Sequence, residues 1–160
     1  MKKILIINLF FVALIISSCS KDQKAVNQLK GEWEETEWNY SISFLGFNQS
    51  ETIDPPEKRV YTFEKCKVKN EYCNGTLTIE NSTNQYFTYT VQDEGETIEF
   101  VNNDGILIFE LEKIDRNTRK IHLKDNETIE ALLAGTGELD GLDFEEFGIQ
   151  FGLTITLKKL

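Results

Sequence analysis

The sequence predicts an all-β protein, an eight-stranded antiparallel up-and-down barrel with a short N-terminal helical turn. Apolar and polar residues alternate strictly in several short stretches, which indicates strands with one buried and one solvated face. Turn sequences such as QDEGE, NNDG and DRNTR separate these stretches, and their Gly and Asn residues tolerate positive φ. Strands with mostly short connections favour a closed barrel, because closure removes the exposed sheet edges. A β-sandwich normally needs longer crossing connections.

The first element in chain order is an N-terminal segment that resembles a bacterial lipoprotein signal peptide. Lys2 and Lys3 precede an apolar run over residues 4–16, which is shorter than the roughly 20 residues that a membrane-spanning helix needs. The motif ISSC then places small residues directly before Cys19. This layout is typical of a cleaved signal peptide over residues 1–18. The resemblance implies that fatty-acyl chains such as palmitate are attached to Cys19, which becomes the new N-terminus.

The lipid anchor implied by this motif would place the protein in a bacterial cell envelope, with the outer membrane as the expected site. Two or more acyl chains give durable anchoring, whereas a single chain is marginal. An ordinary signal peptide that ends in a chance cysteine is the alternative. Residues 19–26 follow as a short polar tether. Lys21 and Asp22 only partly match the lysine-acidic signals that send some lipoproteins to the cell surface. The periplasmic face and the cell surface therefore both remain possible locations.

The acidic balance of the chain excludes several classes of partner. The formal net charge is -10, and removal of Lys2 and Lys3 with the signal peptide takes two positive charges away, which leaves -12. Nucleic acid binding needs a basic face, and electrostatic docking on anionic lipid needs basic clusters. We therefore expect no nucleic acid partner, and we expect the lipid anchor to hold the protein at the membrane.

The two remaining cysteines, Cys66 and Cys73, form an even pair in a compartment that we expect to be oxidising. Such a pair favours a disulfide over free thiols. A metal site is the competing interpretation, but His122 is the only histidine, and four-coordinate zinc would need further thiolates or imidazoles. We expect a disulfide, and neither a metal nor a cofactor.

The strands follow in order along the mature chain. The clearest is the last, in which Phe147, Ile149 and Phe151 begin an apolar face while glycine, glutamine and threonine occupy the other face. Helix is expected only as a turn or two in AVNQLKG and TIEALLAG. The eight expected strands cover residues 32–44, 58–69, 75–81, 85–92, 96–101, 106–113, 119–124 and 148–159.

The start of the first strand, LKGEW, resembles the Gly-x-Trp signature of lipocalins and of the lipocalin-like, calycin-type domains of small bacterial lipoproteins. The strand and turn pattern of this family continues through VYTFEK, GTLTI and FTYTVQDEGETIEF, so the resemblance covers a domain of residues 27–160. It implies that Trp33 closes one end of the barrel and that Gly31 lets the helical turn pack there. Lipocalins usually place an arginine from the last strand over this tryptophan, whereas this chain offers only Lys158 and Lys159.

The first strand contains a break in its alternation. Trp38 and Tyr40 share one face with further apolar residues, while Trp33 falls on the other. If all of them point inward, a bulge must lie among residues 34–37, because one extra residue flips the alternation and bends the strand. So many inward rings favour a filled or narrow interior. The candidate ligand-pocket residues are Trp38, Tyr40, Phe63, Phe87, Tyr89, Phe100, Phe109 and Phe151.

Two long connections should meet at one mouth of the barrel, because strand direction alternates in a meander. These are LGFNQSETIDPPEKR after the first strand and DNETIEALLAGTGELDGLDFEEF before the last. Trp33 and the Cys66–Cys73 hairpin should lie at the opposite end. The acids of both connections would give the mouth a negative field that disfavours fatty-acid anions.

Two function classes fit these observations. The first is a binding module, in which the barrel holds a small apolar or amphipathic molecule between aromatic walls. The second is a structural or accessory lipoprotein with a filled barrel, which acts through an envelope protein partner. We expect no enzyme, because no catalytic constellation is visible. His122 should face solvent, and the acids of residues 138–146 lack the spacing of a calcium-binding loop.

Overall fold

A computed structural model describes residues 20–67, 72–103, 105–123 and 149–160. The predicted signal peptide, Cys19 and the acids of residues 138–146 lie outside these ranges. Within them, no helix is long and apolar enough to cross a membrane. The described elements are α2 (Ser20–Leu29), η1 (Asp93–Gly95) and nine strands: β1 (Gly31–Phe44), β2 (Phe47–Ile53), β3 (Arg59–Phe63), β4 (Cys73–Ile79), β5 (Gln85–Gln92), β6 (Thr97–Asn102), β7 (Gly105–Lys113), β8 (Thr118–Leu123) and β9 (Gln150–Lys159).

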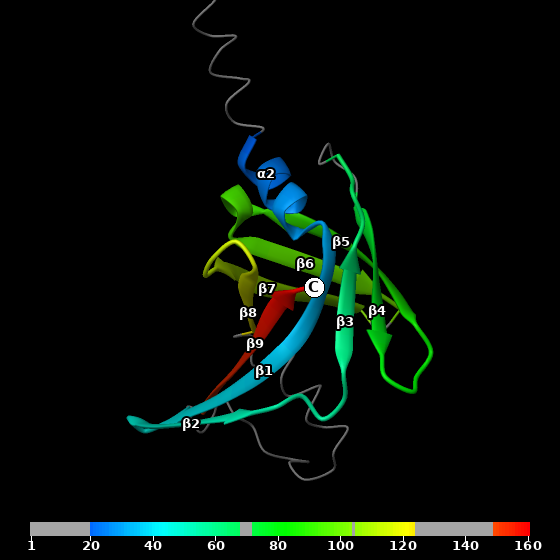
Figure 1. The fold of residues 1–160 in the computed structure, drawn as a ribbon. Coiled ribbons are helices and arrows are strands. Elements are labelled where there is room, and N and C mark those ends of the chain that lie inside the picture. The colour runs from blue at the N-terminus through cyan, green and yellow to red at the C-terminus, as the bar shows by residue number, and fades with distance from the viewer. Residues whose placement is uncertain (1–19, 68–71, 104, 124–148) are drawn as a thin grey trace, which may run out of the picture.

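Eight of these strands close into an antiparallel barrel, which confirms the predicted fold class. Consecutive strands pair from β3 to β9, and β1 joins the two ends by pairing with β3 along one edge and with β9 along the other. Figure 1 shows this closure, with α2 lying over one end of the barrel. An eight-stranded up-and-down barrel is the architecture that the lipocalin resemblance implied.

The ninth strand, β2, lies in a segment that we predicted to be a long loop, and that prediction is wrong. β2 pairs with the outer half of β1, from Trp38 opposite Ile53 to Phe44 opposite Phe47. Leu45 and Gly46 connect the two strands and both have positive φ, as a tight two-residue hairpin turn requires. The sequence signal was weak, because leucine is an unusual residue at such a turn and β2 is exposed along its whole length.

The predicted bulge in β1 is confirmed. Glu35 pairs with Leu157 and Glu37 pairs with Thr156, so Thr36 is an extra residue on β1 with no counterpart on β9. The extra residue changes the parity of the strand. As a result, Trp33 and Trp38 both contribute to the interior, although an offset of five positions would place them on opposite faces of a regular strand.

The strand register also fixes which features lie at each end of the barrel. Gly31 pairs with Phe63, so the chain leaves β3 towards Cys66 at the same end as Trp33. The predicted Cys66–Cys73 disulfide is present there, with 5.6 Å between its Cα atoms. β8 ends at Leu123 at the opposite end, where the first residues of β9 pair with the outer half of β1. The start of the β1–β3 segment, which contains β2, and the described ends on either side of residues 124–148 therefore lie at one mouth.

α2 covers the end that carries Trp33. The helix begins at Ser20 and so includes most of the residues that we expected to form a tether. Val26 and Leu29 are fully buried in the main hydrophobic cluster, and the Gln23 side chain donates a hydrogen bond to the Cys66 carbonyl. Gly31 joins α2 to β1 at φ +116, a conformation that favours glycine. The helix therefore packs directly on the barrel.

Candidate functional site

The centre of the barrel is filled by a cluster of aromatic rings. Phe63, Phe87, Tyr89, Phe100 and Phe109 are buried, and neighbouring rings lie with their centroids 5.0 to 6.3 Å apart. These five predicted pocket residues come from β3, β5, β6 and β7. The arrangement matches the edge-to-face and offset contacts that aromatic pairs prefer.

A glycine in β4 makes this packing possible. Phe87 lies directly over Gly75, which is its partner in the β4–β5 ladder. A Cβ atom at Gly75 would come within 2.3 Å of the Phe87 ring. No side chain could replace this glycine without moving the aromatic cluster.

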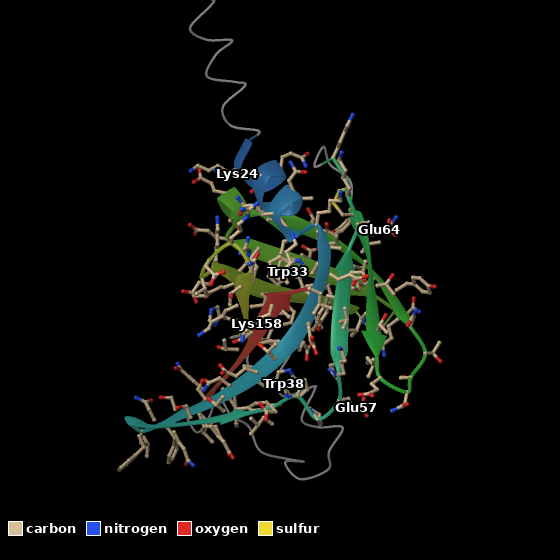
Figure 2. The ribbon with its side chains drawn as sticks, viewed as in Figure 1. Lys24, Trp33, Trp38, Glu57, Glu64 and Lys158 are labelled. Carbon is tan, nitrogen blue, oxygen red and sulfur yellow. A yellow bond between two sulfur atoms is a disulfide. The ribbon has the colours of Figure 1, made fainter. Side chains whose placement is uncertain are left out.

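The other three predicted pocket residues lie nearer the mouth. Trp38 and Phe151 are partly buried and pack against the central cluster. Tyr40 is 37% exposed, so it lies at the rim and not in the enclosed interior. Figure 2 shows Trp33 and Trp38 at successive levels along β1, with Trp33 nearer to α2. Tyr61 was missed by the sequence analysis, although its ring contacts Phe63, Phe87 and Phe100.

A partly open cavity of about 100 Å³ adjoins the aromatic cluster. Its wall is mostly apolar, with rings from Tyr61, Phe100 and Phe109 and polar groups from Gln85 and Asn102. Typical small-molecule pockets measure roughly 300 to 1,000 Å³. The interior is therefore narrow, as the number of inward rings indicated.

A carboxylate lies in this interior. Glu35 is only 4% exposed, and the Trp38 indole donates a hydrogen bond of 2.7 Å from Nε1 to its Oε2 atom. Burial raises the pKa of Glu35 above its ordinary value, while hydrogen bonds with Tyr61 and Trp38 and the positive charge of Arg59 oppose that rise. Burial also raises the pKa of Tyr61 well above its ordinary value, and the neighbouring Glu35 adds to this effect.

Arg59 is the fourth member of a polar cluster that also contains Glu35, Trp38 and Tyr61. Its guanidinium lies 5.0 Å from the centroid of the Trp38 ring. Over the described part of the chain, three buried side-chain atoms have no partner at ordinary hydrogen-bond geometry, and two of them, Glu35 Oε1 and Arg59 Nε, belong to this cluster. An unpartnered buried polar atom costs roughly 1 to 3 kcal/mol. Sequence alternation alone gave no sign of this cluster, because it treats Glu35 as one more polar residue.

The closed end of the barrel is organised around Trp33. This side chain is fully buried, and its indole donates a hydrogen bond to the Leu29 carbonyl at the end of α2. The Arg119 guanidinium lies 5.2 Å from the centroid of the Trp33 ring, and Lys159 Nζ lies 5.4 Å from it. Trp33 and Gly31 thus lie at the end of the barrel that α2 covers. The arginine comes from β8, a strand that we did not consider for this role.

The outer wall carries groups that pair with one another. His122 accepts or donates hydrogen bonds with Thr154 Oγ1 at 2.9 Å and with Glu112 Oε2 at 3.1 Å, and it lies outside the barrel as expected. An open groove of about 1,060 Å³ between α2 and β7 is lined by both acids and bases, including Lys24 and His122. No group of three metal-ligating side chains occurs among the residues described.

The mouth carries several exposed acids. Glu51, Asp54 and Glu57 are exposed on the segment between β1 and β3, whereas the acids of the second long connection lie outside the described ranges. The described part of the mouth is therefore acidic on the β2 side.

Comparisons with known proteins find similarity among solved structures. No protein-family model matches the chain, and no curated protein matches it. The chain is similar to a solved structure described as EF1p2_mFAP2b bound to DFHBI, with 14% sequence identity and a TM-score of 0.40. The match covers 87% of this chain and 99% of the other. The closed strand pairing, and not this similarity, identifies the barrel.

Proposed function

We propose that the protein is a non-enzymatic envelope lipoprotein, anchored through Cys19, whose barrel binds a small apolar or amphipathic molecule. The anchor is supported by the ISSC motif behind a basic and apolar N-terminal segment. The observation that carries the binding role is the partly open cavity, which has aromatic walls and a few polar groups. Ligand sites in proteins combine these two kinds of lining.

The size of the cavity limits the ligand. An engineered cavity of roughly 150 Å³ in another protein holds benzene, and the cavity here measures about 100 Å³. The ligand portion that enters this space is therefore a single ring or a short chain. A long fatty-acid tail does not fit within the described interior.

A second function is favoured by one observation on the outer wall. Tyr86, Ile106 and Ile108 are more than half exposed on β5 and β7. Val101 pairs with Ile106 between them, so apolar side chains occupy adjacent outward positions of the sheet. Such exposed apolar surface is typical of protein contacts. The barrel could then serve as a filled scaffold for an envelope protein partner.

A cavity-filling variant tests the binding role. Leu107 lines the cavity, whereas its neighbour Ile108 points outward on the same strand. Full-length protein in detergent should show saturable NMR shifts with toluene or 2-pyridone. Leu107→Phe should abolish these shifts, because the new ring occupies the cavity, and Ile108→Phe should preserve them.

The opposite result would favour the scaffold role. If neither probe binds the unmodified protein, or if both phenylalanine variants bind equally well, the cavity is not the binding site. Native mass spectrometry of protein purified from its own envelope would then detect a retained protein partner in place of a small ligand.

A further inference from the structure

The polar cluster inside the barrel points to the chemical class of the ligand. Resting on the proposed binding function, we propose that Glu35 and Arg59 form the polar end of the interior site. They select an uncharged ring that carries a hydrogen-bond donor next to an acceptor, as in a cyclic amide. Each of these two residues has a buried polar atom without a hydrogen-bond partner among the described residues.

Glu35 Oε1 is an acceptor and Arg59 Nε is a donor, and neither has a partner at ordinary hydrogen-bond geometry within the described ranges. Most buried polar groups in proteins are hydrogen-bonded, so unpartnered ones need an explanation. The other oxygen of Glu35 already accepts a hydrogen bond from Trp38. Trp38 thus holds the carboxylate in place, and Oε1 has no hydrogen-bond partner of ordinary geometry within the described residues.

The polar cluster adjoins the cavity through Tyr61. The Tyr61 side chain forms part of the cavity wall, and it also makes a side-chain hydrogen bond with Glu35. The Arg59 guanidinium lies over the Trp38 ring. Trp38 also makes an edge-to-face contact with the ring of Tyr40, which lies at the rim. Glu35 and Arg59 are not part of the cavity wall themselves, so the proposal places the polar edge of the ring past Tyr61, on the side of these two residues.

The charges of the cluster favour an uncharged ligand. Burial raises the pKa of Glu35, and the positive charge of Arg59 opposes that rise. When Glu35 is ionised, the pair carries no net charge. A charged ligand would leave one charge in excess in a medium of low polarity, which is unfavourable. An uncharged cyclic amide instead offers its N–H group to Glu35 Oε1 and its carbonyl to Arg59 Nε.

The two tryptophans of the chain provide separate reporters for a test. The Trp38 indole bonds to Glu35, whereas the Trp33 indole bonds to the Leu29 carbonyl at the closed end. We would titrate ¹⁵N-labelled full-length protein in detergent with 2-pyridone, N-methyl-2-pyridone and toluene. 2-Pyridone should shift the Trp38 indole signal saturably and leave the Trp33 signal in place.

The decisive comparison is between a probe that has an N–H donor and a probe that lacks one. N-methyl-2-pyridone has no N–H group, so it should bind at least about tenfold more weakly than 2-pyridone, as expected for the loss of a hydrogen bond to a charged group. If the two compounds bind equally well, or shift only the Trp33 signal, the inference is wrong while the binding role stands. If no probe binds, the proposed function fails as well.

A matched pair of variants adds a second reading. Glu35→Gln keeps the size of the side chain but removes its charge, and it should weaken 2-pyridone binding about tenfold or more. Glu32→Gln, on an exposed side chain of the same strand, should leave binding unchanged. Unchanged binding in folded Glu35→Gln would overturn the inference. The comparison of the three probes needs no variant, so it decides the question even if Glu35→Gln does not fold.

Discussion

At the scale of single residues, Glu35 shows how a charged side chain comes to lie inside an apolar barrel. The bulge at Thr36 leaves Glu35 on the same face of β1 as Trp33, and the cluster with Trp38 and Arg59 surrounds it. Desolvation is the largest influence on its pKa and raises it. The folded protein therefore binds a proton at Glu35 more readily than the unfolded chain does.

This shift predicts a pH dependence of stability. As the pH rises above about 4.5, the ordinary pKa of Glu35, the unfolded chain loses this proton before the folded protein does. The contribution of Glu35 to the free energy of unfolding should then fall until the raised pKa is passed. Urea unfolding between about pH 4 and pH 8 should show a shallower fall for Glu35→Gln than for Glu32→Gln. Identical pH profiles for the two variants would contradict the assignment.

Arg119 has a structural role at the closed end. Its guanidinium stacks on Trp33 and donates hydrogen bonds to the carbonyl oxygens of Asp115 at 2.5 Å and Thr118 at 2.9 Å. Arg119→Leu removes the stacking and both hydrogen bonds, so it should lower the free energy of unfolding by about 2 to 4 kcal/mol. Urea unfolding should show a change within about 0.5 kcal/mol for the exposed Arg116→Leu. Equal effects of the two substitutions would argue against this role.

At the scale of elements, the bulge in β1 lets one strand serve two parts of the barrel. The inner end of β1 pairs with β3, and its outer half pairs with β2, while β9 follows the opposite edge. The bend at Thr36 is where these two regions meet. A regular strand of the same sequence would turn either Trp33 or Trp38 towards solvent.

Deletion of Thr36 tests this interpretation. Without the extra residue, the alternation of β1 is continuous and one of the two tryptophans must leave the interior. We expect the deletion to abolish cooperative thermal unfolding, whereas Thr36→Ser should change stability by less than about 1 kcal/mol. Near-ultraviolet circular dichroism during thermal melting would measure both. A deletion variant that melts like the unmodified protein would refute the role of the bulge.

The disulfide fastens the hairpin between β3 and β4 next to α2. Cys66 and Cys73 are seven residues apart, and a cross-link over so short a loop is worth roughly 2 to 3 kcal/mol by chain entropy. Reduction should lower the melting temperature and leave the barrel folded at room temperature. The double variant Cys66→Ser, Cys73→Ser should not respond to reductant. Two free thiols in protein purified from its native source without reductant would reject the bridge under native conditions.

At the scale of the whole molecule, the helix and the mouth occupy opposite ends of the barrel. α2 begins at Ser20 and covers the end closed by Trp33, while β8 ends at the other end. Figure 1 shows α2 and the β1–β2 hairpin far apart. If Cys19 carries the proposed lipid, the anchor joins the chain at the start of α2 and the mouth lies on the other side of the barrel.

The anchor itself is tested at Cys19. Cys19→Ala removes the thiol that would be acylated, so labelled palmitate should no longer enter the protein. The variant should be released from the membrane or remain as an unprocessed precursor. Ser18→Ala, which keeps a small residue before the cysteine, should still be acylated. Labelling of Cys19→Ala at the level of the unmodified protein would show that the anchor assignment is wrong.

The sequence by itself determined the features that depend on local periodicity or on composition. Alternation indicates which face of a strand is buried, so it predicted the closed barrel and a bulge within residues 34–37, which the structure places between Glu35 and Glu37. The disulfide followed from the presence of only two cysteines after Cys19.

The tertiary structure decided which side chains meet. Arg119 reaches Trp33 from a neighbouring strand, and β2 is a strand because β1 offers a free edge to pair with. Glu35 and Arg59 come together only when β1 and β3 pair, because residues far apart in the chain have no local signal of their contact.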